Sequence, residues 1–66
     1  MPAQWTGEVV AKMHMHRISI KALAEHLGVS REYTGAVLNG KKAPAGAELR
    51  FRAAVDELIA AQSTTE

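Results

Sequence analysis

The sequence predicts an all-helical protein that forms one small domain. Its 66 residues cannot close two separate hydrophobic cores, and they are too few for a barrel or a doubly wound sheet. Apolar residues recur every three to five positions, as in an amphipathic helix, and no stretch alternates apolar and polar residues as a strand would. We expect a compact domain with helices at about residues 6–16, 20–27, 31–38 and 46–62, and a frayed tail at 63–66.

The first and last helices are recognised from their apolar stripes. In the first, Val9, Val10 and Met13 share a face, Thr6 is the candidate N-cap, and Trp5 just before it is placed to pack on Val10. In the last, the apolar positions fall on one stripe of roughly four turns: Phe51, Val55, Leu58 and Ile59.

The two central helices are bounded by strong start and stop signals. Ser19 and Ser30 are candidate N-caps, because a serine hydroxyl can accept a hydrogen bond from an amide of the first turn. Gly28 ends the first of these helices, since glycine takes a positive φ without a Cβ penalty, and Asn39-Gly40 ends the second.

The segment LAEHLGVSREYTGAVLNGKKAP indicates a helix-turn-helix. Two helices that cross steeply over a three-residue turn need a small residue on the first helix, a glycine in the turn and apolar inner faces. These roles fall to Ala24, to Gly28, and to Leu27, Val29 and Val37. The arrangement leaves the start of the second helix protruding, free to enter a DNA major groove.

Over about residues 17–44 the same segment resembles the phage Cro/repressor DNA-binding domains of the Xre type, small prophage and plasmid regulators in particular. The resemblance implies a lambda-repressor-like helical domain that binds operator DNA, usually as a dimer, and represses or switches transcription. It assigns base reading to Arg31, Glu32, Tyr33 and Ala36, and phosphate contacts to Ser30, Asn39, Lys41 and Lys42.

Several of these residues have more than one interpretation. Arg31 is either an ordinary solvated charge or a contact to a base or phosphate, with guanine as the base that it can bind with two hydrogen bonds. Glu32 either accepts from a cytosine amino group or complements the helix N-terminus. Tyr33 is either a partly buried wedge or a ring that faces DNA. Lys41 and Lys42 are expected to hold phosphates.

The segment departs from the family pattern at three positions. Ile20 stands where the family has a phosphate-binding glutamine, so Ser19 or Lys21 would have to make that contact. Thr34 replaces a branched apolar residue, and Gly35 replaces a serine and weakens the helix by about 1 kcal/mol. These departures support a second hypothesis, a protein-interaction module related to antirepressors or toxin-binding partners.

The charge distribution favours a polyanionic partner. The chain carries a net +1, but residues 30–52 carry +3 and the remainder to residue 66 carries −3. Double-stranded DNA is therefore the expected partner. A homodimer is also expected, since a core of this size supplies only about 3 to 5 kcal/mol.

Other classes of function find little support. There is no cysteine, and His14 and His16 point apart on a helix, so no metal or other cofactor is expected. Paired carboxylates, a nucleophile with a base and a phosphate-binding glycine loop are all missing, so neither an enzyme nor a small-molecule substrate is expected. No apolar run suits a signal peptide or a membrane span, which predicts a cytoplasmic protein. The resemblance implies a bacterial or phage origin and association with the nucleoid.

Overall fold

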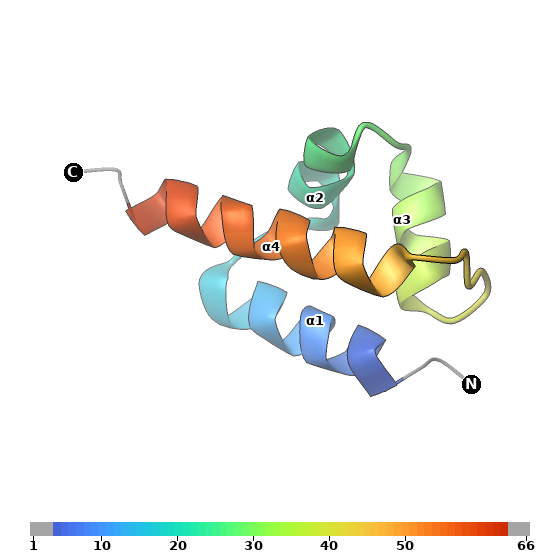
Figure 1. The fold of residues 1–66 in the computed structure, drawn as a ribbon. Coiled ribbons are helices and arrows are strands. Elements are labelled where there is room, and N and C mark those ends of the chain that lie inside the picture. Colours follow the sequence, from blue (N-terminus) through green and yellow to red (C-terminus); the bar gives the residue numbers. More distant parts are fainter. Residues whose placement is uncertain (1–3, 64–66) are drawn as a thin grey trace.

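The computed structural model describes residues 4–63, which form four helices and no strand (Figure 1). The helices are α1 (Gln4–His16), α2 (Ile20–Leu27), α3 (Arg31–Leu38) and α4 (Ala47–Ser63). The predicted fold class is confirmed, and every helix begins and ends within two residues of its expected bounds. Ser63 was expected in the frayed tail but is the last residue of α4; residues 64–66 lie outside the described residues.

Helices α1 and α4 lie side by side and run in the same direction (Figure 1). Two ion pairs join them along a line that we call the α1–α4 seam. Lys12 Nζ lies 2.7 Å from Asp56 Oδ1, and Arg52 Nη2 lies 2.8 Å from Glu8 Oε1. Both pairs join residues 44 positions apart, which is the constant offset that parallel helices require.

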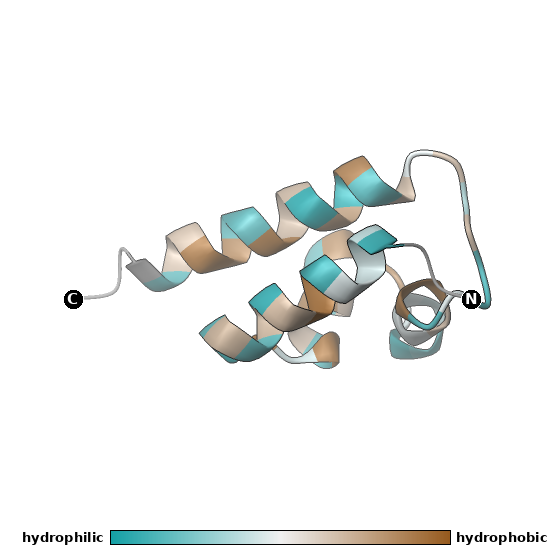
Figure 2. Ribbon diagram, turned by 90° about the horizontal axis from the view of Figure 1, so that it is seen from below, coloured by the Kyte–Doolittle hydropathy of each residue, from teal (hydrophilic) through white to brown (hydrophobic). Residues whose placement is uncertain are grey.

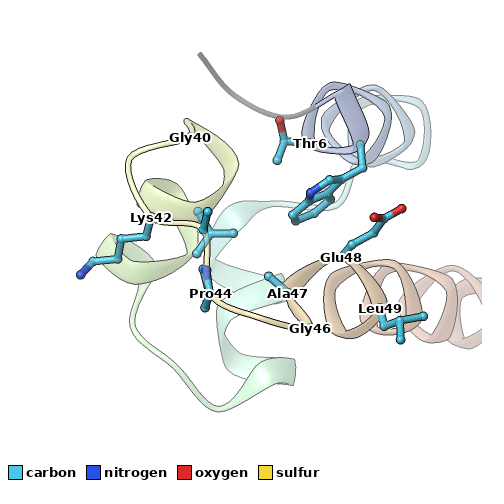
Figure 3. A pocket seen from close by; sticks show the side chains of 11 residues that line it. Thr6, Gly40, Lys42, Pro44, Gly46, Ala47, Glu48 and Leu49 are labelled. Carbon is cyan, nitrogen blue, oxygen red and sulfur yellow. The ribbon is translucent and has the colours of Figure 1, made fainter.

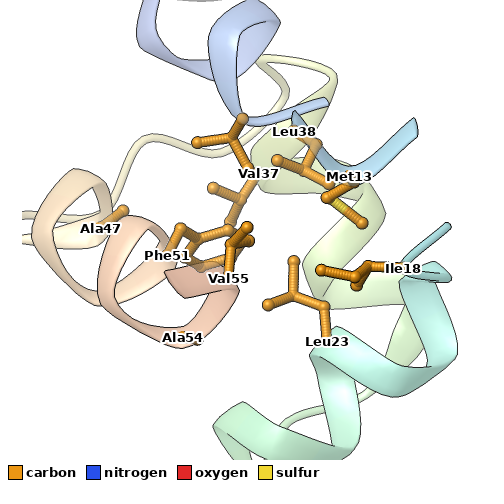
Figure 4. Close-up of a cluster of buried hydrophobic side chains, with 10 residues drawn as sticks. Met13, Ile18, Leu23, Val37, Leu38, Ala47, Phe51, Ala54 and Val55 are labelled. Carbon is orange, nitrogen blue, oxygen red and sulfur yellow. The ribbon is translucent and has the colours of Figure 1, made fainter. Parts of the chain in front are cut away.

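The core forms where all four helices meet (Figure 4). Leu23 from α2, Val37 from α3 and Val55 from α4 are almost completely buried, and Val9 and Met13 reach them from α1. Figure 2 shows the corresponding pattern of polar and apolar bands along α1 and α4. Burial of these side chains, rather than helix propensity, stabilises such short helices.

The start of α1 differs from the prediction. The helix begins at Gln4, so Thr6 is its third residue, and at 3% exposure it is a buried side chain and not the N-cap. Trp5 lies within the helix, where its ring packs edge-on against Phe51 with 5.9 Å between ring centroids. This contact between α1 and α4 gives the two additional residues of the helix a tertiary partner.

Three helices end in the same motif, with one residue in the left-handed conformation. These residues are Arg17 (φ 59°), Gly28 (φ 77°) and Gly40 (φ 82°). In each case the next amide donates to a carbonyl five residues earlier: Ile18 to Met13 at 2.8 Å, Val29 to Ala24 at 3.0 Å and Lys41 to Ala36 at 2.8 Å. The stops predicted at Gly28 and Asn39-Gly40 are thus confirmed.

Candidate nucleic-acid interface

Helices α2 and α3 each begin at a serine cap, and a short turn from Gly28 to Ser30 joins them. Ser19 Oγ accepts a hydrogen bond from the Ala22 amide at 3.0 Å, and Ser30 Oγ accepts one from the Tyr33 amide at 3.0 Å. Both predicted caps are confirmed. Each hydroxyl still has its own hydrogen to donate, because capping uses the oxygen as an acceptor.

The residues on the inner side of α3 are buried in the core. Thr34, which stands where an apolar residue was expected, has no exposed surface, and its Oγ1 donates to the Ser30 carbonyl at 3.0 Å. The buried hydroxyl is therefore satisfied, which removes the main cost of placing a polar group there. Val37 and Leu38 complete this buried face.

The outer side of α3 presents only part of the predicted base-reading set. Arg31 and Glu32 are exposed, whereas Tyr33 and Ala36 are half-buried. Tyr33 packs against the core cluster, which favours the interpretation of a wedge between helices over a ring that faces DNA. Gly35 is half-buried, and a Cβ built on it would meet no atom within 4 Å, so open space adjoins the middle of α3.

The beginnings of α2 and α3 lie close together around an open hollow of about 540 Å³. Its lining consists of Ser19, Ile20, Lys21, Arg31 and Glu32. A second hollow of about 330 Å³ continues along α3 and includes Ile20, Gly35 and Asn39 in its lining. The exposed residues that α2, α3 and their caps contribute to the two hollows form what we call the α2–α3 face: Ser19, Ile20, Lys21, Arg31, Glu32 and Asn39. His14 of α1 is also exposed and lines the second hollow.

Lys41 and Lys42 are exposed in the loop after α3 and do not line either hollow of this face. Lys42 borders a different hollow of about 490 Å³, between the start of α1, the 40–46 loop and the start of α4. Figure 3 shows its side chain extended away from that hollow into open space. The structure thus gathers five of the predicted contacts on the α2–α3 face, namely Ser19, Lys21, Arg31, Glu32 and Asn39, and places Lys41 and Lys42 outside it, in the loop after α3.

The positive charges fall into paired and unpaired groups. On the α1–α4 seam, Lys12 and Arg52 are held by carboxylates. Between α2 and α4, His26 Nε2 lies 2.6 Å from Glu57 Oε1. Within residues 4–63 no ion pair engages the cations next to α2 and α3, namely Lys21, Arg31, Lys41 and Lys42.

Arg52 changes the charge balance read from the sequence, where it counted toward the basic segment. Its guanidinium donates to Glu8 at 2.8 Å and to Glu48 at 3.0 Å. The hydrogen bond to Glu8, followed by that to Glu48, raises the pKa of Arg52. Since its charge is matched by two carboxylates, Arg52 adds little to the field that an approaching polyanion would meet.

Two further observations concern the described part of the chain. No group of three or more His, Cys, Asp or Glu side chains within it is placed to hold a metal ion. None of the helices in residues 4–63 combines the length and hydrophobicity that crossing a bilayer requires.

Comparison of the chain with protein-family models, with curated proteins and with solved structures finds no match. The function must therefore be argued from the geometry and charge of the molecule itself.

Proposed function

We propose that this protein is a sequence-specific regulator that binds double-stranded DNA through the α2–α3 face, with α3 in the major groove. The observation that supports this most is the shared hollow in which the starts of two helices bring Lys21 and Arg31 together without a carboxylate partner within the described residues. A protruding helix with free cations at its start matches the groove and the charge of duplex DNA.

The residues of this face would divide the work of recognition. Arg31 is suited to bind guanine O6 and N7 together, and Glu32 to accept from the amino group of cytosine. The hydroxyls of Ser19 and Ser30 can donate to phosphate oxygens while they cap their helices. Lys21 and Asn39 on this face, and Lys41 and Lys42 in the loop that follows α3, would contact the DNA backbone.

Dimeric binding follows from the size of the domain. Two copies would place their α3 helices about 34 Å apart, so that they read half-sites separated by one turn of DNA. The protein would then act at the nucleoid, in the cytoplasm of a bacterial cell, and repress a promoter that overlaps its operator.

The test is a fluorescence-anisotropy titration with duplexes selected from a random pool. Arg31→Ala is expected to weaken binding by roughly 5- to 150-fold, as loss of a bidentate base contact does, and to relax specificity at one position. Lys42→Ala should weaken binding to all duplexes alike. It should also lower the slope of log Kd against log salt concentration by about 0.9, the value for one phosphate contact.

Two variants on the α1–α4 seam serve as matched controls. Arg52→Ala and Lys12→Ala remove the same residue types and the same charge, but from the α1–α4 seam and not from the residues proposed to contact DNA. Both variants should bind DNA within about twofold of the parent protein. Equal losses for Arg31→Ala and Arg52→Ala, or no binding at low salt by a folded sample, would contradict the proposal.

A second candidate function is favoured by one exposed apolar residue. Leu49 is 77% exposed at the rim of the 490 Å³ hollow, whose lining also includes Trp5, Pro44 and Ala47 (Figure 3). A protein-interaction module would use this surface. In that case Leu49→Ser would remove a co-purifying partner, whereas Arg31→Ala and Lys42→Ala would retain it.

A further inference from the structure

Ile20 is an exposed branched apolar residue that lies between a polar, charged hollow and a second hollow with a mostly apolar lining. It is the first residue of α2, and 43% of its surface is accessible. Its neighbours around the 540 Å³ hollow are a hydroxyl, two cations and a carboxylate, from Ser19, Lys21, Arg31 and Glu32 respectively. Such a side chain neither completes the core nor contributes to the charge of the surface.

Ile20 lies beside α3 and lines both hollows of the α2–α3 face. It lines the hollow that contains Arg31 and Glu32 at the start of α3, and it also lines the hollow that contains Gly35 one turn further along. Gly35 contributes no side chain, and the space where its Cβ would stand is open. Ile20 therefore forms an apolar wall beside open space, next to the residues proposed to read bases.

The chemistry of this wall indicates its ligand. Lys21 and Arg31 flank it with unpaired positive charge, which favours a polyanion, while Ile20 itself requires an apolar group. On the base edges of a DNA major groove, the apolar group is the C5-methyl of thymine.

We propose that Ile20 recognises a thymine methyl group adjacent to the base pair that Arg31 contacts, and so determines part of the operator sequence. The inference rests on the proposed function, because it assigns a further specificity to the same face.

The test uses deoxyuridine, which differs from thymidine only by the absence of that methyl group. Each thymine of the selected duplex is replaced in turn, and Kd is measured by anisotropy. When one particular thymine of each half-site is replaced, the affinity of the parent protein should fall about fourfold, because the complex no longer buries that methyl group. Ile20→Ala should lose much less than fourfold at that same position.

Two further variants complete the experiment. Met15→Ala shortens another exposed apolar residue, 80% accessible on α1 and outside both hollows, and should keep the full uracil effect. Ile20→Val retains a branched wall and should keep most of it. Far-UV circular dichroism checks that each variant is folded.

The outcomes separate this inference from the proposed function. Tight, specific binding with no uracil-sensitive position, or with equal sensitivity in the parent and Ile20→Ala proteins, overturns the role of Ile20 and leaves DNA binding in place. No binding to any duplex overturns both.

Discussion

Arg17 and Gly28 adopt the same left-handed conformation at the ends of successive helices, and they differ in what that conformation costs. A side chain with a Cβ is strained there by about 1 to 2 kcal/mol, whereas glycine is not. Glycine is the usual left-handed residue after a helix, so the sequence signals the one at Gly28. Arginine is not typical of this position, so the left-handed backbone at Arg17 has no sequence signal.

Opposite substitutions at these two residues should shift stability in opposite directions. Gly28→Ala is expected to lower the free energy of unfolding by about 1 kcal/mol, since the new Cβ meets no neighbour and only the backbone strain counts. Arg17→Gly should raise it by up to about the same amount, less the entropy that glycine adds to the unfolded chain. Urea denaturation followed by circular dichroism measures both, and shifts of the same sign would contradict the assignment of the caps.

Gly7 and Gly35 form a second informative pair. Both lie inside helices, and a Cβ at either position would meet no atom within 4 Å. Each change to alanine should therefore stabilise the protein by about 0.5 to 1 kcal/mol.

The two alanine variants should differ in DNA binding. Only Gly35→Ala places a methyl group in the hollow beside Ile20, so it alone should weaken binding to the selected duplex. Thermal melts and anisotropy titrations of both proteins provide the comparison. Equal affinity of the two variants would indicate that DNA does not enter this hollow.

At the scale of elements, the start of α3 depends on one serine. Ser30 Oγ caps the Tyr33 amide, and the Ser30 carbonyl accepts from buried Thr34 Oγ1. Ser30→Ala should cost about 1 kcal/mol in unfolding free energy, while Ser30→Gly should cost only a few tenths. Denaturant titrations distinguish these values, and an unchanged midpoint for Ser30→Ala would show that the cap contributes nothing.

The elements that sequence predicts well are those with local signals. α2 and α3 have a serine cap at the start and a glycine at or near the end, and their observed bounds equal the expected ones. The predicted start of α1 is two residues too late, because the first residues of the helix are supported by the Trp5–Phe51 contact, which joins positions 46 residues apart. No local pattern reports such a contact.

The candidate site shows the same division between local and distant information. The exposure of Arg31 and Glu32 follows from their place after the Ser30 cap, and it was predicted. The pairing of Arg52 with Glu8 depends on the packing of α1 against α4. A count of charges along the sequence therefore includes Arg52 in the basic segment 30–52, although its charge is matched on the α1–α4 seam. That Ile20 lines the same hollow as the start of α3 likewise depends on the fold, although its unusual residue type is visible in the sequence.

At the scale of the whole molecule, the lysine and arginine cations in ion pairs with carboxylates lie on the α1–α4 seam, whereas those without an ion pair in the described residues lie on or next to α2 and α3, apart from Arg17 and Arg50. The seam joins the carboxylates of α1 and α4 to Lys12 and Arg52, which leaves the cations near α2 and α3 free to attract an anion. The hollow at Leu49 lies apart from the α2–α3 face, since the lining residues of the two do not overlap. DNA binding and protein binding therefore predict contacts in different places, except at Lys42, which borders the Leu49 hollow and is also proposed to contact phosphate.

Amide chemical shifts during a titration of the ¹⁵N-labelled protein with a selected duplex test this account most directly. DNA binding through the α2–α3 face predicts that the largest changes occur at Ser19–Lys21, Arg31–Ala36 and Asn39–Lys42, with little change along the α1–α4 seam. Changes centred on Trp5, Pro44 and Leu49, or no changes at low salt, would contradict it.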